Sequence, residues 1–280
     1  MLSYQHEYHA GNFADVHKHL CLRVLFESLL KKDKPFCFID CHAGSGRYDL
    51  QSSEARKTGE SATGIANIWG QGEFSGATAA YVAAVTSLNP DGLLRHYPGS
   101  PELARQWMRP QDAAILFELH PQAQQALRRH YGYDRRFSLH ARDCYEGLPA
   151  LVPPAIKRGL VLLDPSYEIK EEYQQVVELV ARAQRRWANA IYAIWYPLLP
   201  AARHRDLLRG LKQSGMGNIL VSEMAISAPQ DTGGMYGSGL AIVNPPWQAD
   251  EAMEALLPGV CTLLGGDWAR ASLHWLVKKS

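Results

Sequence analysis

Short apolar runs recur along the chain, and several of them end beside an acidic residue. We interpret six of these runs as strands, at residues 34–40, 113–119, 137–141, 159–164, 190–196 and 219–224. They are apolar on both faces, which is typical of buried strands in a mostly parallel sheet. Two later runs, residues 239–245 and 272–277, also have the character of strands.

Helical patterns separate the predicted strands. Apolar residues recur at spacings of three and four over residues 121–131, 171–187, 201–213 and 248–264, and a further helix is expected to begin near Phe13. A strand followed by a helix, repeated along the chain, predicts a doubly wound α/β fold.

The segment from Ser52 to Asp112 breaks this alternation. About 65 residues separate Gly46 from the next predicted strand, whereas a simple strand–helix–strand unit needs about 30. Residues 78–88 and 101–108 have helical patterns, and no convincing strand is present. We therefore interpret residues 52–112 as a helical insertion within a single domain that spans residues 1–280.

Composition and charge narrow the class of protein. The chain has 280 residues, of which 46% are hydrophobic and 20% charged, as in ordinary globular proteins. Lys and Arg number 29 and Asp and Glu 28, so any nucleic-acid surface must be local. The five cysteines are an odd number without a CxxC pair, which favours a reducing cytosol. Neither a secretory signal nor a membrane span is apparent, and we expect a cytoplasmic protein.

Glycines and acids follow the predicted strands at the edge where α/β sheets bind ligands. Residues 40–46 read Asp-Cys-His-Ala-Gly-Ser-Gly, where Gly44 and Gly46 allow a sharp turn into a helix and the close approach of a ligand. The third glycine of a dinucleotide-binding motif is missing. Glu118 and Asp143 follow the next two strands. There, one acid can accept the hydroxyls of a ribose and the other the amine of an adenine.

The fourth strand ends in Asp164-Pro165-Ser166-Tyr167. This sequence resembles the D-P-P-Y motif of amino-group methyltransferases that use S-adenosylmethionine. The resemblance implies that Asp164 and the Pro165 carbonyl accept the two hydrogens of a target amine, and that Tyr167 stacks on the base. An aryl amine is a weak nucleophile that must be held in line with the methyl group. Ser166 replaces a proline and relaxes a backbone restraint, but both acceptors remain, so we expect activity to be kept.

Two other segments attract attention. Asn244-Pro245-Pro246-Trp247 has a similar pattern, but it follows a late strand, and we interpret it as a structural turn.

The first 19 residues contain four of the 11 histidines. No pair of residues there has the spacing of zinc ligands, and we expect no metal site. We expect Lys18 or His19 to bind the carboxylate of the methionine moiety, and Tyr4 and His6 to line the base pocket.

Almost end to end, the chain resembles the RlmJ family of bacterial adenine-N6 methyltransferases of large-subunit (23S) ribosomal RNA. The matching motifs are Tyr4-x-His6-x-x-His9-Ala10-Gly11-Asn12, Asp15-Val16-x-Lys18-His19, His42-Ala43-Gly44-x-Gly46-Arg47-Tyr48, Tyr97-Pro98-Gly99-Ser100-Pro101, Glu118-Leu119-His120-Pro121, Trp195-Tyr196-Pro197 and Asn244-Pro245-Pro246-Trp247. The resemblance implies a Rossmann-like class I methyltransferase fold with a helical insertion after the first strand. It also implies S-adenosylmethionine as cofactor, a catalytic Asp164 and a substrate-side Tyr4. The implied cofactor contacts are Lys18, His19, His42, Ser100, Glu118, Asp143, Cys144 and Asp164.

The motifs leave the substrate open. The same chemistry suits DNA adenine, cytosine N4 or a protein glutamine amide, and a DNA-binding or nuclease role in the use of external DNA is a further alternative. A nuclease usually needs clustered carboxylates that hold metal ions, whereas the acids here follow separate strands. If the substrate is RNA, we expect a small basic and aromatic rim around Asp164, with Tyr4 and Tyr167 stacking on a base turned out of its helix. No obligate protein partner is evident.

Overall fold

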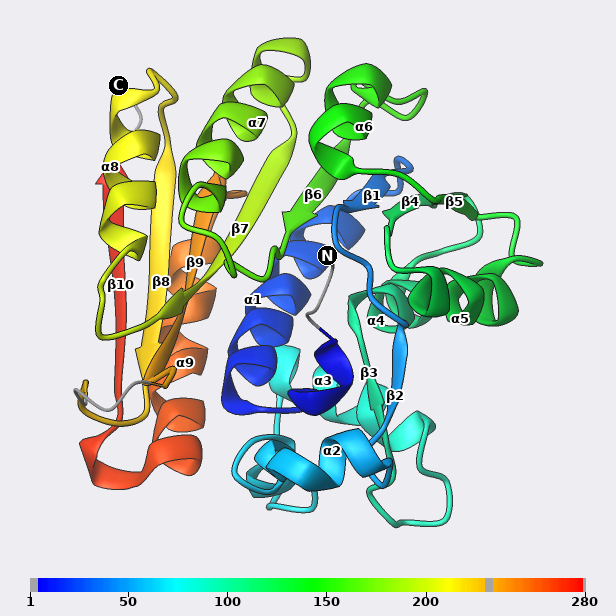
Figure 1. The fold of residues 1–280 in the computed structure, drawn as a ribbon, viewed down its shortest axis with the longest axis vertical. Coiled ribbons are helices and arrows are strands. Elements are labelled where there is room, and N and C mark those ends of the chain that lie inside the picture. The colour runs from blue at the N-terminus through cyan, green and yellow to red at the C-terminus, as the bar shows by residue number, and fades with distance from the viewer. Residues whose placement is uncertain (1–4, 230–233, 279–280) are drawn as a thin grey trace.

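A computed structural model of the chain describes residues 5–229 and 234–278. These residues form an eight-stranded sheet with helices on both faces, together with a separate two-stranded ribbon (Figure 1). In spatial order the strands of the sheet are β10 (Arg270–Val277), β8 (Ile219–Ala225), β9 (Gly237–Val243), β7 (Ile191–Leu198), β6 (Gly159–Leu163), β1 (Cys37–Asp40), β4 (Ala113–Phe117) and β5 (Phe137–His140).

The sheet is mostly parallel. Strands β5, β4, β1, β6 and β7 pair in parallel, whereas β9 is antiparallel to β7 and β8, and β10 is antiparallel to β8. Successive side chains of a strand point to opposite faces. In β6, Leu160 and Leu162 enter one core and Val161 and Leu163 the other, which explains why this strand is apolar throughout. The predicted α/β fold with a mostly parallel sheet is confirmed.

Helices cover both faces of the sheet. One face packs against α1 (Phe13–Leu30), α3 (Gly76–Ser87), α4 (Ser100–Trp107), α5 (Pro121–Tyr131) and α9 (Ala249–Gly265). The other packs against α6 (Cys144–Leu151), α7 (Glu172–Arg186) and α8 (His204–Gln213). Apart from the helix expected after Gly46, the predicted strands and helices outside residues 52–112 coincide with these elements, with small differences at their ends. None of the described helices has the length and apolar character that a membrane span requires.

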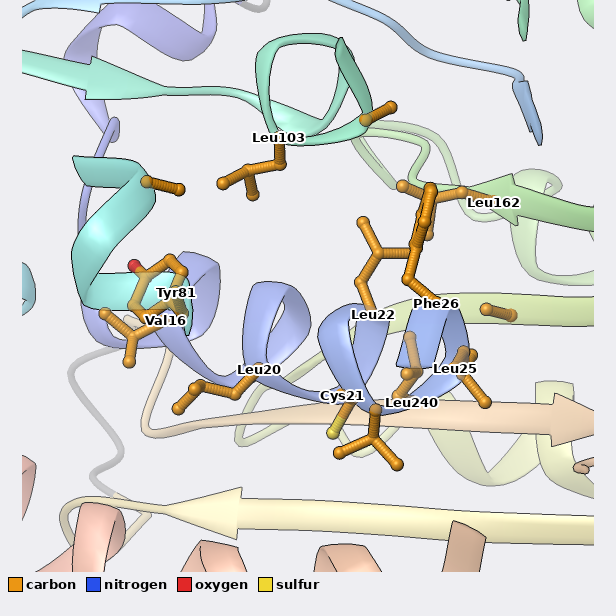
Figure 2. Close-up of a cluster of buried hydrophobic side chains, with 14 of the residues drawn as sticks. Val16, Leu20, Cys21, Leu22, Leu25, Phe26, Tyr81, Leu103, Leu162 and Leu240 are labelled. Atoms are coloured by element: carbon orange, nitrogen blue, oxygen red, sulfur yellow. The ribbon is translucent and has the colours of Figure 1, made fainter. Parts of the chain in front are cut away.

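Helix α1 is buried around most of its circumference. It lies between the sheet and helices α3 and α9, and an apolar surface on all sides is the mark of a helix inside the core. Figure 2 shows its apolar residues in a cluster that joins it to α3, α4, β6 and β9. The labelled members are Val16, Leu20, Cys21, Leu22, Leu25, Phe26, Tyr81, Leu103, Leu162 and Leu240.

The chain between β1 and β4 differs in part from the prediction. The predicted helices at residues 78–88 and 101–108 are α3 and α4, and α2 (Ser53–Thr58) with the short 3-10 turns η2 (Glu60–Ala62) and η3 (Ile65–Asn67) comes before them. After Gly46, however, the chain forms strand β2 (Arg47–Asp49) and not a helix. Strand β2 pairs with β3 (His96–Pro98), which lies within the segment predicted to lack strands. Each strand has three residues, too few for a periodic pattern.

Candidate active site

The loops that follow β1, β4, β5 and β6 converge on a cavity of about 460 Å³ at the carboxyl ends of these strands. This is where open α/β sheets bind ligands, and the volume suits a small molecule. Most of the predicted site residues line the cavity, namely His6, Lys18, His19, His42, Gly44, Ser100, Glu118, Asp143, Cys144, Asp164 and Pro165. Tyr4 lies outside the described residues.

Glu118 is held by the backbone of two loops. Its carboxylate accepts hydrogen bonds from the amide of Gly44, at 2.8 Å, and from the amide of His120, at 2.7 Å. Gly44 has a φ of +59°, and a Cβ atom there would lie 2.2 Å from the hydroxyl of Tyr48. The glycine therefore lets the first loop reach Glu118, and the acid is fixed in place before any ligand arrives.

Asp143, Cys144 and His42 form the neighbouring wall. Asp143 caps helix α6 by accepting a hydrogen bond at 2.8 Å from the amide of Tyr145 through Oδ1. His42 accepts a hydrogen bond at 3.2 Å from the amide of Asp164 through Nδ1, and its Nε2 lies 3.5 Å from the sulfur of Cys144. Since Nδ1 is an acceptor, the ring proton lies on Nε2 and faces Cys144. His42 thus holds the loop after β6 against the loop after β5.

Lys18 lies between two carboxylates. Its ammonium is 2.9 Å from Oδ1 of Asp15 and also donates to Oδ2 of Asp164. Burial lowers the pKa of Lys18, but Asp15 and Asp164 together raise it above its ordinary value. Burial likewise raises the pKa of Asp15, but His6 and Lys18 hold it well below the usual range. Lys18 is therefore a cation held beside Asp164. Its ammonium already makes ion pairs with both Asp15 and Asp164.

Asp15 also anchors the N-terminal segment to this cluster. Its Oδ2 accepts a hydrogen bond from the Gly11 amide and lies 2.9 Å from Nε2 of His6. His6 belongs to the 3-10 turn η1 (His6–Tyr8), and Glu7 of the same turn accepts a hydrogen bond at 2.6 Å from Ser45, in the loop after β1. The segment therefore lies along the rim of the cavity.

The next residues of α1 are polar and buried. His17 lies 2.9 Å from the Ser222 hydroxyl on β8 and 3.0 Å from the Ser238 hydroxyl on β9, and burial lowers its pKa to about 4. His19 lines the cavity, and its Nδ1 is 2.8 Å from the hydroxyl of Tyr97. These contacts fix the rotation of α1, and hence the direction of Lys18.

Tyr167 does not lie where the motif predicts. Its ring is buried, its centroid is 4.3 Å from that of Tyr173, and its hydroxyl donates to the carbonyl of Trp195 at 2.7 Å. The backbone at Tyr167 has a φ of +53°, which turns the side chain into the core. In this structure the ring is not available to stack on a base, and the predicted stacking role is corrected here.

The second proline motif is a turn. The side-chain amide of Asn244 donates to the carbonyls of Ala188 and Ala190, at 2.7 and 3.0 Å. Trp247 is 85% exposed. The residues of this motif do not line the cavity.

Sequence reasoning missed two acids. Asp15 has no predicted role beyond its place in the motif that contains Lys18, although it contacts His6, Gly11 and Lys18. Asp40 ends β1 and is fully buried, and burial raises its pKa to about 6. Its position at the end of a strand, like those of Glu118 and Asp164, was the available signal. Within the described residues, no three His, Cys, Asp or Glu side chains gather as metal ligands.

Comparison with known proteins decides the family. Residues 33–277 match the family model described as Ribosomal RNA large subunit methyltransferase D, RlmJ. The chain belongs to the RlmJ family. The family predicted from the sequence motifs is thereby confirmed.

RlmJ relatives match over nearly the whole chain. The Ribosomal RNA large subunit methyltransferase J of Escherichia coli (strain K12) is 42% identical over 278 residues, which cover 99% of each chain. The protein of the same name from Haemophilus influenzae is 40% identical over 281 residues, again 99% of each chain. A crystal structure of a Legionella pneumophila protein superposes with a TM-score of 0.88 at 32% identity, covering 95% of this chain and 98% of that one.

Proposed function

We propose that the protein transfers a methyl group from S-adenosylmethionine to the N6 amine of an adenine in 23S ribosomal RNA. At the level of enzyme class, the chain is an S-adenosylmethionine-dependent methyltransferase of ribosomal RNA. One observation carries the finer proposal. Asp164 and Pro165, which can hold an amine, line the same cavity as Glu118 and Asp143, which suit a nucleoside.

The residues of the cavity fit the cofactor. The fixed carboxylate of Glu118 can accept ribose hydroxyls, and Asp143 can accept the amine of an adenine. At the other end, His19 has a buried Nε2 without a partner among the described residues. Ser100, the first residue of α4, also lines the cavity, and a helix N-terminus favours negative charge. We propose that this end of the cavity holds the carboxylate of the cofactor in contact with His19. Lys18 instead binds Asp164.

Asp164 and Pro165 orient the target. Lys18 occupies Oδ2 of Asp164, which leaves Oδ1 for one amine hydrogen, and the carbonyl of Pro165 accepts the other. The contact with the Lys18 ammonium holds the carboxyl group of Asp164 in place for the incoming amine.

The chemistry follows from that alignment. S-adenosylmethionine supplies a methyl group on a positively charged sulfur, which leaves with the electrons of the carbon–sulfur bond. The nitrogen lone pair, aimed by Asp164 and Pro165, forms the new carbon–nitrogen bond, and the surplus proton of the amine passes to solvent. The chain's contribution is alignment of the two reactants.

The substrate side is proposed to be the rim beside Asp164. His6 lies there, and we propose that Tyr4 and His6 contact the base that has left its stack.

We further propose that the chain is one domain with residues 52–112 as an insertion, since a single sheet continues on both sides of that segment. Because its substrate is ribosomal RNA, we expect the protein to act in the cytoplasm.

Replacing Asp164 tests this function. With transcribed 23S ribosomal RNA and radiolabelled cofactor, Asp164→Ala should lower methyl transfer by about 100-fold or more, the typical effect of losing a group that acts on the transition state. Binding of S-adenosylhomocysteine, measured by calorimetry, should change little. Asp206→Asn, at an acid that is 66% exposed, is the control and should be fully active.

Mass spectrometry of the RNA nucleosides identifies the product. We expect N6-methyladenosine from the wild-type protein and none from Asp164→Ala. Full activity of Asp164→Ala contradicts the mechanism, and faster methylation of duplex DNA than of ribosomal RNA contradicts the proposed substrate.

A further inference from the structure

His19 has one engaged and one unengaged ring nitrogen. The ring lines the cavity, is 1% exposed, and is bonded through Nδ1 to the hydroxyl of Tyr97 at 2.8 Å. Nε2, on the opposite side of the ring, is fully buried and has no partner among the described residues. A buried polar atom without a partner costs stability. Because His19 lines the cavity, we expect a bound ligand to supply the missing hydrogen-bond partner of Nε2.

Two buried tyrosines stand behind His19. The hydroxyl of Tyr97, on β3, is 2.8 Å from the hydroxyl of Tyr81, on α3, and both side chains are fully buried. Figure 2 shows Tyr81 in the apolar cluster that also contains Val16 of α1. Both tyrosines come from the segment of residues 52–112, which thereby reaches the cofactor side of the cavity.

The number of protons fixes the direction of this chain of hydrogen bonds. Within the described residues, the Tyr81 hydroxyl has Tyr97 as its hydrogen-bond partner and no other. If Tyr97 donated to Tyr81, the Tyr81 hydrogen would be buried without an acceptor, which is unfavourable. Tyr81 therefore donates to Tyr97, and Tyr97 donates to Nδ1 of His19. Burial, followed by the charge of Lys18, lowers the pKa of His19 to about 3, so the ring is neutral and its single proton lies on Nε2.

We propose that Tyr97, supported by Tyr81, is a positioning residue that holds His19 in the Nε2–H form, so that this N–H donates to the carboxylate of the amino-acid end of S-adenosylmethionine. The inference rests on the proposed placement of the cofactor and adds residues that do not touch it. It also assigns a role to the segment of residues 52–112. Through Tyr97 and Tyr81, this segment determines which ring nitrogen of His19 carries the proton that faces the cofactor.

Two ligands separate this role from general damage to the fold. S-adenosylhomocysteine carries the amino-acid carboxylate, whereas 5′-deoxy-5′-methylthioadenosine shares its adenosine and sulfur but lacks that end. By calorimetry, Tyr97→Phe should weaken S-adenosylhomocysteine about tenfold, the effect of one hydrogen bond, and leave methylthioadenosine unchanged within about twofold. Tyr81→Phe should weaken S-adenosylhomocysteine by only about two- to threefold, because Tyr97 can still donate.

A double variant tests whether Tyr97 acts through His19. In a His19→Leu background, Tyr97→Phe should cause no further loss of S-adenosylhomocysteine affinity. Tyr133→Phe, at a tyrosine that is 97% exposed, is the matched control and should bind both ligands normally.

The outcomes are distinct. Equal losses for both ligands in Tyr97→Phe, or no loss of S-adenosylhomocysteine affinity, overturn the role of Tyr97. A wild-type protein that binds neither ligand overturns the proposed cofactor site, and the role of Tyr97 with it.

A second measurement needs no tyrosine variant to fold. In ¹⁵N spectra of histidine-labelled wild-type protein, the His19 ring is identified by its absence in His19→Leu. We expect a protonated Nε2 and a bare Nδ1 at neutral pH. A proton on Nδ1 overturns the proposal.

Discussion

Removing the charge of Lys18 should damage both stability and activity. The side chain is 5% exposed and its ammonium bridges Asp15 and Asp164. Lys18→Met keeps most of the apolar stem and leaves two carboxylates facing each other without their cation. Removing one partner of a buried ion pair typically costs about 3–5 kcal/mol. Since a domain is stable by about 5–15 kcal/mol, the variant should fold with a reduced margin.

The loss should depend on pH. In the wild-type protein the folded-state pKa of Asp15 is lowered, so its contribution to stability is present above the unfolded-state pKa of about 3.9 and disappears as the pH falls below it. Without Lys18, the folded-state pKa of Asp15 should rise, because burial raises it and one of the cations that lower it is gone. Proton uptake then relieves the repulsion between the two acids. The deficit should be larger at pH 8 than at pH 5.

Urea unfolding followed by circular dichroism at these two pH values measures the deficit. Arg209→Met is the control, because it removes the cation of an exposed ion pair. The side chains of Arg209 and Asp206 are 64% and 66% exposed, and the loss of this pair should cost less than about 0.5 kcal/mol. Adding Asp164→Asn to Lys18→Met should restore part of the stability but not methyl transfer. A deficit below about 1 kcal/mol, or one equal at both pH values, refutes the reasoning.

Three other outcomes are expected. Gly44→Ala should cost about 1–3 kcal/mol in thermal unfolding and weaken S-adenosylhomocysteine binding, whereas Gly59→Ala, at a φ of +65° with open space around it, should show the backbone strain alone and normal binding. Asn244→Ala should destabilise the protein by about 1–2 kcal/mol, through two lost hydrogen bonds, without changing kcat/KM in the methylation assay; lost activity would contradict a purely structural turn. His17 has a folded-state pKa of about 4, below its unfolded value of about 6.5, so between these pH values the unfolded state binds more protons than the folded state. As the pH drops from about 6.5 to about 4, the free energy of unfolding should therefore decrease by about 1.4 kcal/mol per pH unit. Urea unfolding at pH 7.5 and 5 should show a smaller fall in His17→Gln, and an equal fall would contradict this source of acid sensitivity.

The acids of the cavity could be located from the sequence because of one geometric rule. Glu118, Asp143 and Asp164 each follow an apolar strand, and the carboxyl ends of parallel strands share one edge of the sheet. The α/β fold was predicted correctly from the alternation of strands and helices, and the family, the enzyme class and the cofactor were predicted correctly from the motif resemblance. Apart from the stacking role of Tyr167, the individual roles of the site residues stay predictions.

The rest depends on contacts between distant residues that leave no local pattern. Lys18 meets Asp164 across 146 positions, and His19 meets Tyr97 across 78. A motif names the residue Tyr167 but not its φ of +53°, which turns the ring inward. Strands β2 and β3 exist through pairing with each other, and three residues are too few to reveal that in advance.

The two hydroxyls that hold His17 have a consequence for how the enzyme is made. Helix α1 leaves the ribosome early, but its contacts with Ser222 and Ser238 span 205 and 221 positions. During synthesis the orientation of the helix is therefore fixed only after β8 and β9 have emerged. Lys18 and His19 lie on that helix, so we expect a nascent chain that has not yet paired β8 with β9 to lack an ordered catalytic centre. Pairing of these two late strands and the onset of activity are thus coupled by the topology of the sheet.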